Sequence, residues 1–154
     1  MHTRLLAARS LLTLGVVALA AACGGGSSNS SSTPLGPGYF ITISGMSFSP
    51  LDLHVPPGGT VTVINRDSMP HSVTSETAAN AFTPGAVAGV SFDTGEFAGQ
   101  KSFTIPTTAA EGTVIPYYCT LHRQTMVTPN GTITVDKSAA QAPASGGSGG
   151  GGGY

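Results

Sequence analysis

Four side chains that bind soft or borderline metals stand out in this sequence. Cys119, His122 and Met126 lie on one short segment, and His71 lies far upstream at the head of a strand-like run. Two histidines, one cysteine and one methionine are the ligand set of a blue-copper electron-transfer centre. The sulfur atoms suit Cu(I) and the imidazoles suit Cu(II), so a site built from both holds either oxidation state with little rearrangement. The set predicts one copper ion as the cofactor and one-electron transfer as its chemistry.

Each of these residues also has an ordinary structural explanation. His71 could cap a strand, His122 could be a surface histidine, and Cys119 could be a buried, inert thiol. Met126 could fill a gap in the core, as methionine often does. All four explanations would have to hold together to remove the metal site, so we favour copper. His54 lies outside the pattern and is expected to be a surface histidine at a strand end.

Three segments resemble the plastocyanin/azurin family of cupredoxins. They are residues 69–75 (MPHSVTS), 92–97 (FDTGEF) and 117–122 (YYCTLH), and the resemblance spans roughly residues 39–136. The segment 76–91 is longer than the short turn expected there.

The resemblance implies a role for each ligand. His71, Cys119 and His122 would lie in one trigonal plane around the copper, and Met126 would be the weak axial ligand. The backbone N–H of Ser72, just after the first histidine, would point at the thiolate and stabilise charge on the sulfur.

Short strands are expected to position these ligands. Residues 60–65 alternate with period two, and the Pro/Gly run at 56–59 is a strong turn signal. The predicted strands are 39–44, 51–55, 60–65, 71–74, 91–93, 101–105, 114–118 and 132–135. About eight short strands separated by turns argue for an all-β fold, a cupredoxin-like Greek-key β-sandwich.

Smaller expectations follow from the same pattern. Asn130-Gly131 is interpreted as a hairpin turn. Glu76, Asp93 and Glu96 show no paired acid/base arrangement and are expected to face solvent. The predicted core residues are Phe40, Ile43, Phe48, Val61, Val63, Phe103, Ile105, Tyr117, Ile133 and Val135.

The two ends of the chain differ in composition from its middle. Residues 1–22 have a basic start and a short apolar run, which is typical of an export signal. Small residues directly before Cys23 resemble a bacterial lipobox, which implies a lipid on Cys23. The alternative is ordinary cleavage that leaves Cys23 free. We divide the chain into a lipoprotein signal peptide (1–22), a Gly/Ser-rich tether (23–38), a cupredoxin domain (39–136) and a disordered tail (137–154).

The signal predicts an exported protein at the periplasmic or cell-envelope face, anchored to the membrane by lipid. Exported domains usually pair their cysteines, and Cys119 would have no partner if Cys23 carries lipid. Metal ligation would protect that odd thiol. Without the two arginines of the signal the net charge is about −3, and no basic patch points to nucleic acid.

These features predict a monomeric electron carrier rather than an enzyme. Its partner would be a redox protein, such as a c-type cytochrome or a terminal reductase or oxidase. A copper storage or delivery protein is the alternative, but it would carry extra Met/His-rich stretches, which the sequence lacks. A copper nitrite reductase or multicopper oxidase would need more domains and more histidine ligands.

Overall fold

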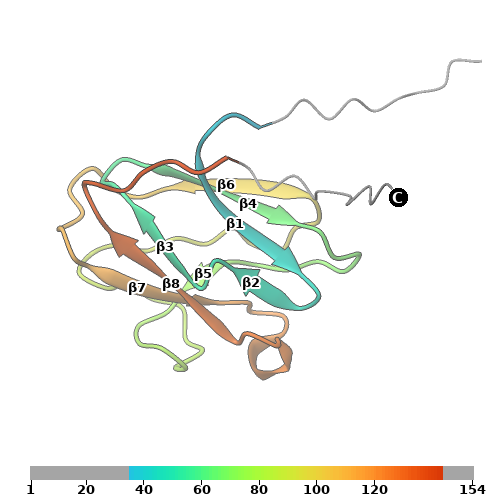
Figure 1. The fold of residues 1–154 in the computed structure, drawn as a ribbon. Coiled ribbons are helices and arrows are strands. Elements are labelled where there is room, and N and C mark those ends of the chain that lie inside the picture. The colour runs from blue at the N-terminus through green and yellow to red at the C-terminus, as the bar shows by residue number, and fades with distance from the viewer. Residues whose placement is uncertain (1–34, 144–154) are drawn as a thin grey trace, which may run out of the picture. The chain divides into compact units, whose positions relative to one another are not determined.

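Two four-stranded sheets make up the part of the chain that the computed structural model describes, residues 35–143 (Figure 1). One sheet has the order β2-β1-β4-β6 and contains β1 (Tyr39–Ser44), β2 (Ser47–Ser49), β4 (Thr60–Asn65) and β6 (Gln100–Thr104). The other has the order β3-β8-β7-β5 and contains β3 (Asp52–Val55), β5 (Thr74–Ser75), β7 (Val114–Tyr118) and β8 (Asn130–Val135). A 3-10 turn, η1 (Arg123–Thr125), lies between β7 and β8. The predicted all-β fold with eight strands is confirmed.

Each sheet is mixed, because the chain crosses between the sheets instead of forming a simple meander. β1 pairs with β4 in parallel, and β3 pairs with β8 in parallel. The connections from β2 to β3 and from β4 to β5 both change sheet, as expected in a Greek-key sandwich. This arrangement brings the end of β4 and the end of β7, which precede His71 and Cys119, to the same side of the core.

Period-two alternation builds the core between the sheets. In β1, Tyr39, Ile41 and Ile43 are buried, and in β8, Ile133 and Val135 are buried. Eight of the ten predicted core residues are buried: Ile43, Phe48, Val61, Val63, Ile105, Tyr117, Ile133 and Val135.

The other two predicted core residues are only half-buried. Phe40 points to the outer face of β1, because it has the opposite parity to Ile43, and its ring covers Gly38. Phe103 packs against the edge of the core, where its ring stacks on Phe92 with centroids 4.2 Å apart.

Three strand assignments from the sequence are wrong in detail. The strand β2 was not predicted, and residues 91–93 form no strand beyond a single bridge between Asp93 and Thr74. His71 precedes β5 and forms only an isolated bridge with Phe97. The two-residue strand β5 lies at the edge of its sheet and pairs with β7.

The predicted hairpin turn at Asn130-Gly131 is also wrong, since both residues begin β8. Gly131 lies opposite Tyr117 on β7. A Cβ atom at Gly131 would come 2.2 Å from the Tyr117 ring, and that ring is fully buried. The glycine is needed for close approach and not for a turn.

A tight hairpin joins β1 to β2. Ser44 pairs with Ser47, which leaves the two-residue turn Gly45-Met46, with φ of +58° and +61°. Positive φ at both positions is the geometry of a type I′ turn, whose twist matches that of the strands. Met46 accepts this conformation although it is not a glycine, and its side chain packs against the core.

The described chain begins and ends side by side (Figure 1). Gly38 and Ala142 exchange two backbone hydrogen bonds of 2.9 Å, and the Tyr39 hydroxyl donates to the Ala139 carbonyl. The structure describes residues 137–143 as well, beyond the domain boundary at residue 136 expected from the sequence. Within residues 35–143 no helix is long and apolar enough to cross a membrane. The predicted signal peptide, Cys23 and the rest of the tether and tail lie outside the described residues.

Candidate metal centre

Three of the four predicted ligands form one cluster beneath the surface. The Sγ of Cys119 lies 3.8 Å from Nδ1 of His71 and 3.5 Å from Nδ1 of His122, and the two nitrogens are 3.2 Å apart. His71 and Cys119 are fully buried, while His122 is half-buried. In the described part of the chain these three residues are the only such group of His, Cys, Asp or Glu.

The triangle has the size that a metal ion requires. A point equidistant from the corners of a triangle with sides of 3.8, 3.5 and 3.2 Å lies about 2.0 Å from each corner. Imidazole nitrogen and thiolate sulfur bind a transition metal such as zinc at about 2.0–2.3 Å. Two histidines and one cysteine around such a point form the trigonal arrangement of a blue-copper centre. The residues present therefore fit a copper ion.

Backbone hydrogen bonds hold His71 beyond the end of β4. His71 and Phe97 exchange two of them, at 3.1 and 2.9 Å. The Asn65 side chain, at the end of β4, donates to the carbonyls of Met69 and Phe97 at 2.9 and 3.2 Å. The position of the first imidazole is thus set by two neighbouring segments of the framework and not by a free loop.

A carboxylate orients the His71 ring. Nε2 of His71 lies 3.1 Å from Oδ2 of Asp67, which also accepts the Met46 N–H at 2.9 Å, and Oδ1 accepts the Gly45 N–H at 2.6 Å. An ionised carboxylate only accepts, so Nε2 carries the proton and Nδ1 presents its lone pair to the cluster.

The protonation of this pair suits metal binding. Hydrogen bonding, chiefly from the Met46 N–H, lowers the pKa of Asp67 below its usual value. Burial lowers the pKa of His71, which outweighs the opposing effect of the Asp67 hydrogen bond. At neutral pH the pair is therefore a carboxylate and a neutral imidazole, and a neutral imidazole can ligate a metal.

Asp67 was missed in the sequence analysis. The only local signal is its position four residues before His71. Its meaning depends on the Gly45-Met46 turn, which donates two N–H groups to it and was not predicted.

The segment that follows His71 also supports the cysteine. The Ser72 N–H points at the Cys119 sulfur at 3.4 Å, as expected. The Ser72 hydroxyl lies 2.9 Å from the Thr120 hydroxyl and accepts the Thr120 N–H at 2.9 Å. One fully buried serine, next to the first histidine, therefore binds both the cysteine sulfur and the residue that follows it.

The 3-10 turn η1 folds the segment after His122 back on itself. The His122 carbonyl accepts the N–H groups of Thr125 and Met126, at 2.7 and 3.0 Å. Met126 is buried, with 4% of its surface exposed, and Val127 then donates its N–H to the Met46 carbonyl at 2.8 Å. The turn thus returns Met126 to the buried core that also contains Cys119.

Two other predicted positions lie apart from the cluster. His54 is exposed between Asp52 and Asp136, at 3.4 and 2.9 Å, as expected for a surface histidine. Glu76 was expected to face solvent, and that was wrong: it is fully buried. Its acceptor oxygens are satisfied by donors from a loop and from β8.

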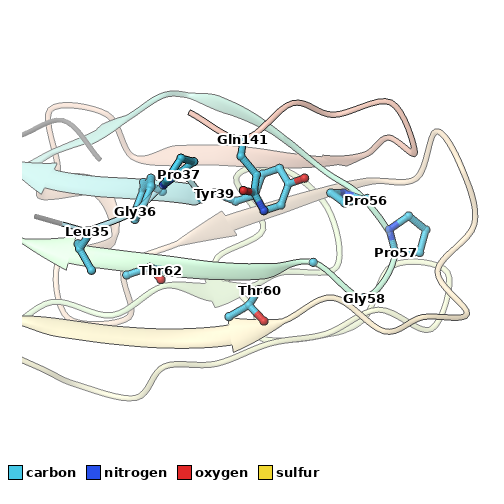
Figure 2. A pocket seen from close by; sticks show the side chains of 13 residues that line it. Leu35, Gly36, Pro37, Tyr39, Pro56, Pro57, Gly58, Thr60, Thr62 and Gln141 are labelled. Carbon is cyan, nitrogen blue, oxygen red and sulfur yellow. The ribbon is translucent and has the colours of Figure 1, made fainter. Parts of the chain in front are cut away.

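A hollow of about 590 Å³ lies at the other end of β4, around the start of β1 (Figure 2). Its lining contains no histidine, cysteine or charged side chain and consists mainly of glycine, proline, threonine and aromatic residues. Thr60 lines this hollow, whereas Asn65 at the opposite end of the same strand supports the His71 segment. The hollow therefore does not belong to the metal-binding chemistry.

The chain is similar to a family of known proteins. A family model described as copper binding proteins, plastocyanin/azurin family, matches residues 40–136. Among solved structures, the chain is similar to an oxidized methionine-to-leucine mutant of amicyanin, with 28% identity over 63% of this chain and 80% of that chain and a TM-score of 0.44. It is also similar to a purple cupredoxin from Nitrosopumilus maritimus, with 29% identity over 63% of this chain and 98% of that chain and a TM-score of 0.46. No curated protein matches the chain significantly.

Asp67→Asn should weaken copper binding. The variant keeps the size of the side chain but loses the charge and one acceptor, so the His71 ring is less well fixed. We expect the affinity for Cu(I) to fall about 10–100-fold, as for other partners of metal-ligating histidines. Competitive titration with a Cu(I) chelator measures this. Glu96→Gln removes the same charge from an exposed position and should leave the affinity unchanged; equal affinities for both variants would show that Asp67 does not support the site.

Proposed function

Since the chain belongs to the plastocyanin/azurin family of copper-binding proteins, we propose that it is a one-electron carrier with a single type 1 copper ion. His71, Cys119 and His122 would be the equatorial ligands and Met126 the axial one. The observation that carries this proposal is the buried triangle of two Nδ1 atoms and one Sγ, of the size that one metal ion spans. A copper ion held by these residues would accept one electron from a partner, giving Cu(I), and return to Cu(II) when it passes that electron on.

The protein's part is to keep the ligands in place in both oxidation states. His71 is fixed by Phe97 and Asp67, and the sulfur of Cys119 by the segment around Ser72. Because these supports are hydrogen bonds within the folded framework, they would resist movement of the ligands when the charge of the metal changes. Rigid, water-excluded ligands lower the structural change that accompanies each electron transfer.

The surface above the ligand segment fits a redox partner. His122 is half-buried, while Leu121 and Val127 on the same segment are exposed by 39% and 74%, and Met69 near His71 by 45%. Between Leu121 and Val127, Arg123 is the one charged residue. A small apolar patch with little charge favours a weak encounter that dissociates quickly, which suits electron transfer. We propose that electrons enter and leave through the exposed edge of His122.

Storage or delivery of copper is the alternative function. A storage site would be accessible for metal exchange, whereas His71, Cys119 and Met126 are buried here. Catalysis would require an open position for substrate, and the four proposed ligands complete the set of an electron-transfer centre. We therefore propose that the protein is not an enzyme.

The fold is compatible with a membrane tether. We propose that Cys23 carries lipid and holds the domain at the outer side of a membrane, in the periplasm or cell envelope. The described chain begins beside the start of β1, at the end of the sandwich away from His71 and Cys119.

Loading the protein with Cu(II) should give an intense blue colour from charge transfer between the Cys119 thiolate and copper. Cys119→Ser should abolish the band, because the hydroxyl is not the soft ligand that copper requires. The visible absorption spectrum decides this, with Cys23→Ser as the matched control that should stay blue. An intense blue band in Cys119→Ser would exclude Cys119 as the ligand.

Met126→Leu should raise the reduction potential and leave the blue band in place. Loss of the thioether weakens an axial interaction that tunes the potential. For a one-electron couple, a tenfold change in the relative affinity for the two states equals about 59 mV, and we expect a shift on this order. Voltammetry of the variant and of the exposed control Met69→Leu measures it. Equal potentials in both would assign Met126 to the core alone.

Leu121→Lys should slow electron self-exchange. Two copies that meet at the His122 surface would then oppose like charges, which we expect to lower the rate on the order of tenfold at low salt. Val114→Lys places the same charge on an exposed position at the far end of β7 and should have little effect. If the Leu121 variant exchanges at the wild-type rate, docking occurs elsewhere.

Mass spectrometry of the mature protein should find a lipid-modified Cys23 at the N-terminus. Several acyl chains would anchor the domain stably, while one would hold it only marginally. An unmodified Cys23 would remove the membrane anchor from the proposal and leave the copper site untouched.

A further inference from the structure

Glu76 is a fully buried carboxylate that directly follows β5, at the start of the long connection to β6. Its Oε1 accepts the Asn80 N–H at 3.2 Å and its Oε2 accepts the Phe82 N–H at 2.6 Å. Oε1 also accepts a hydrogen bond from Nδ2 of Asn130. A carboxylate is retained in a protein interior only when donors compensate the loss of water, and these three amide groups do so.

Two of those donors determine the shape of the loop. Because Glu76 binds the N–H groups of both Asn80 and Phe82, residues 77–82 must curl around its side chain. The curl is closed by a backbone hydrogen bond from Thr77 to Thr83. It places the Phe82 ring edge-on against Tyr118, with centroids 5.7 Å apart and planes at 78°. Tyr118 is itself buried and is bonded directly to Cys119.

The third donor connects the carboxylate to the strand that leads to the cysteine. Asn130 lies opposite Tyr118 in the β7–β8 pairing, and its Nδ2 also donates to the Tyr117 carbonyl at 3.3 Å. The Glu76 N–H donates to the Pro116 carbonyl at 2.9 Å. Glu76 therefore holds β7 at Pro116 through its backbone, at Tyr117 through Asn130 and at Tyr118 through Phe82.

We infer that Glu76 is a positioning residue of the copper centre: it clamps residues 77–82 onto Tyr118 and so fixes the end of β7 that carries Cys119. It does not touch the proposed ligands. It acts by holding the residues that precede Cys119, with Phe82 packed against Tyr118. The inference deepens the proposed function and rests on Cys119 being a ligand.

The first test uses the copper-free, full-length chain. Wild type and Glu76→Ala are treated with an alkylating agent, and modification of Cys119 is followed by peptide mass spectrometry, so that Cys23 does not contribute. We expect Cys119 to react about tenfold faster or more in Glu76→Ala, because loss of buried hydrogen bonds favours local opening. Glu76→Gln keeps one acceptor oxygen and should give an intermediate rate. Glu96→Ala, an exposed control, should react like wild type.

A second variant shows whether Glu76 acts through the loop. Phe82→Ala removes the ring that covers Tyr118 and should also expose Cys119, while Glu76→Ala combined with Phe82→Ala should add little further. The same variants, loaded with Cu(II), should show a shifted blue band and a shifted potential. If Glu76→Ala does not fold, Glu76→Gln and Phe82→Ala decide the matter.

Unchanged Cys119 reactivity in the folded, copper-free variants would overturn the inference. Higher reactivity would also overturn it if the blue band and the potential of the Cu(II)-loaded variants stayed unchanged. A wild-type protein that is not blue with Cu(II) would instead overturn the proposed function. The alkylation rates of the copper-free protein would still report whether Glu76 protects the thiol.

Discussion

Two imidazole nitrogens 3.2 Å apart must face one another across a gap that also faces a cysteine sulfur. In the form that binds a metal, both nitrogens present lone pairs and the sulfur is a thiolate, so these three groups repel one another until a cation lies between them. The framework therefore has to hold the triangle against its own electrostatics. It does so with main-chain hydrogen bonds between His71 and Phe97, and with a serine that ties the first ligand segment to the second. The geometry that suits a cation thus belongs to the fold and not to a flexible loop.

The turn between β1 and β2 is the point where the two halves of the centre meet. Its N–H groups fix Asp67, and through that carboxylate they fix the His71 ring. The carbonyl of Met46 accepts the N–H of Val127, which follows Met126 directly. One two-residue turn therefore supports both the first imidazole and the end of the ligand segment. The positive φ of Met46 is required for this, since a type I′ turn directs those backbone groups to both neighbours.

The proposed ligands and the core residues can be predicted from the sequence better than the hydrogen bonds that hold them in place. The four proposed ligands could be found because their chemistry is rare and their order along the chain is distinctive, and the core could be found because strands alternate. Phe40 and Ile43 cannot both face the core, because they are three residues apart in a strand whose side chains alternate between its two faces. Asn130-Gly131 was taken for a turn because a close approach to an aromatic ring leaves the same glycine in the sequence as a turn does.

Asp67 and Glu76 could not have been assigned from the sequence, for a different reason. A carboxylate acquires a role only from the donors around it, and these donors are backbone N–H groups whose positions depend on the folded chain. Nothing in the residue types of Gly45, Met46 or Phe82 indicates that they will donate to an acidic side chain. Long-range hydrogen bonding to the main chain is therefore the part of the site that sequence patterns do not contain.

The two imidazoles of the cluster are supported unequally, so the centre has a buried side and a side that faces the surface. His71 is fully buried, and its outer nitrogen is occupied by Asp67. His122 is half-buried and is carried by a short segment that ends in a single 3-10 turn. In the proposed carrier, His71 would hold the metal from the buried side. His122 would be the ligand nearest to a partner, because its ring is partly exposed. An electron would enter through His122, while the hydrogen bonds from Phe97 and Asp67 would hold His71 in place during contact with a partner.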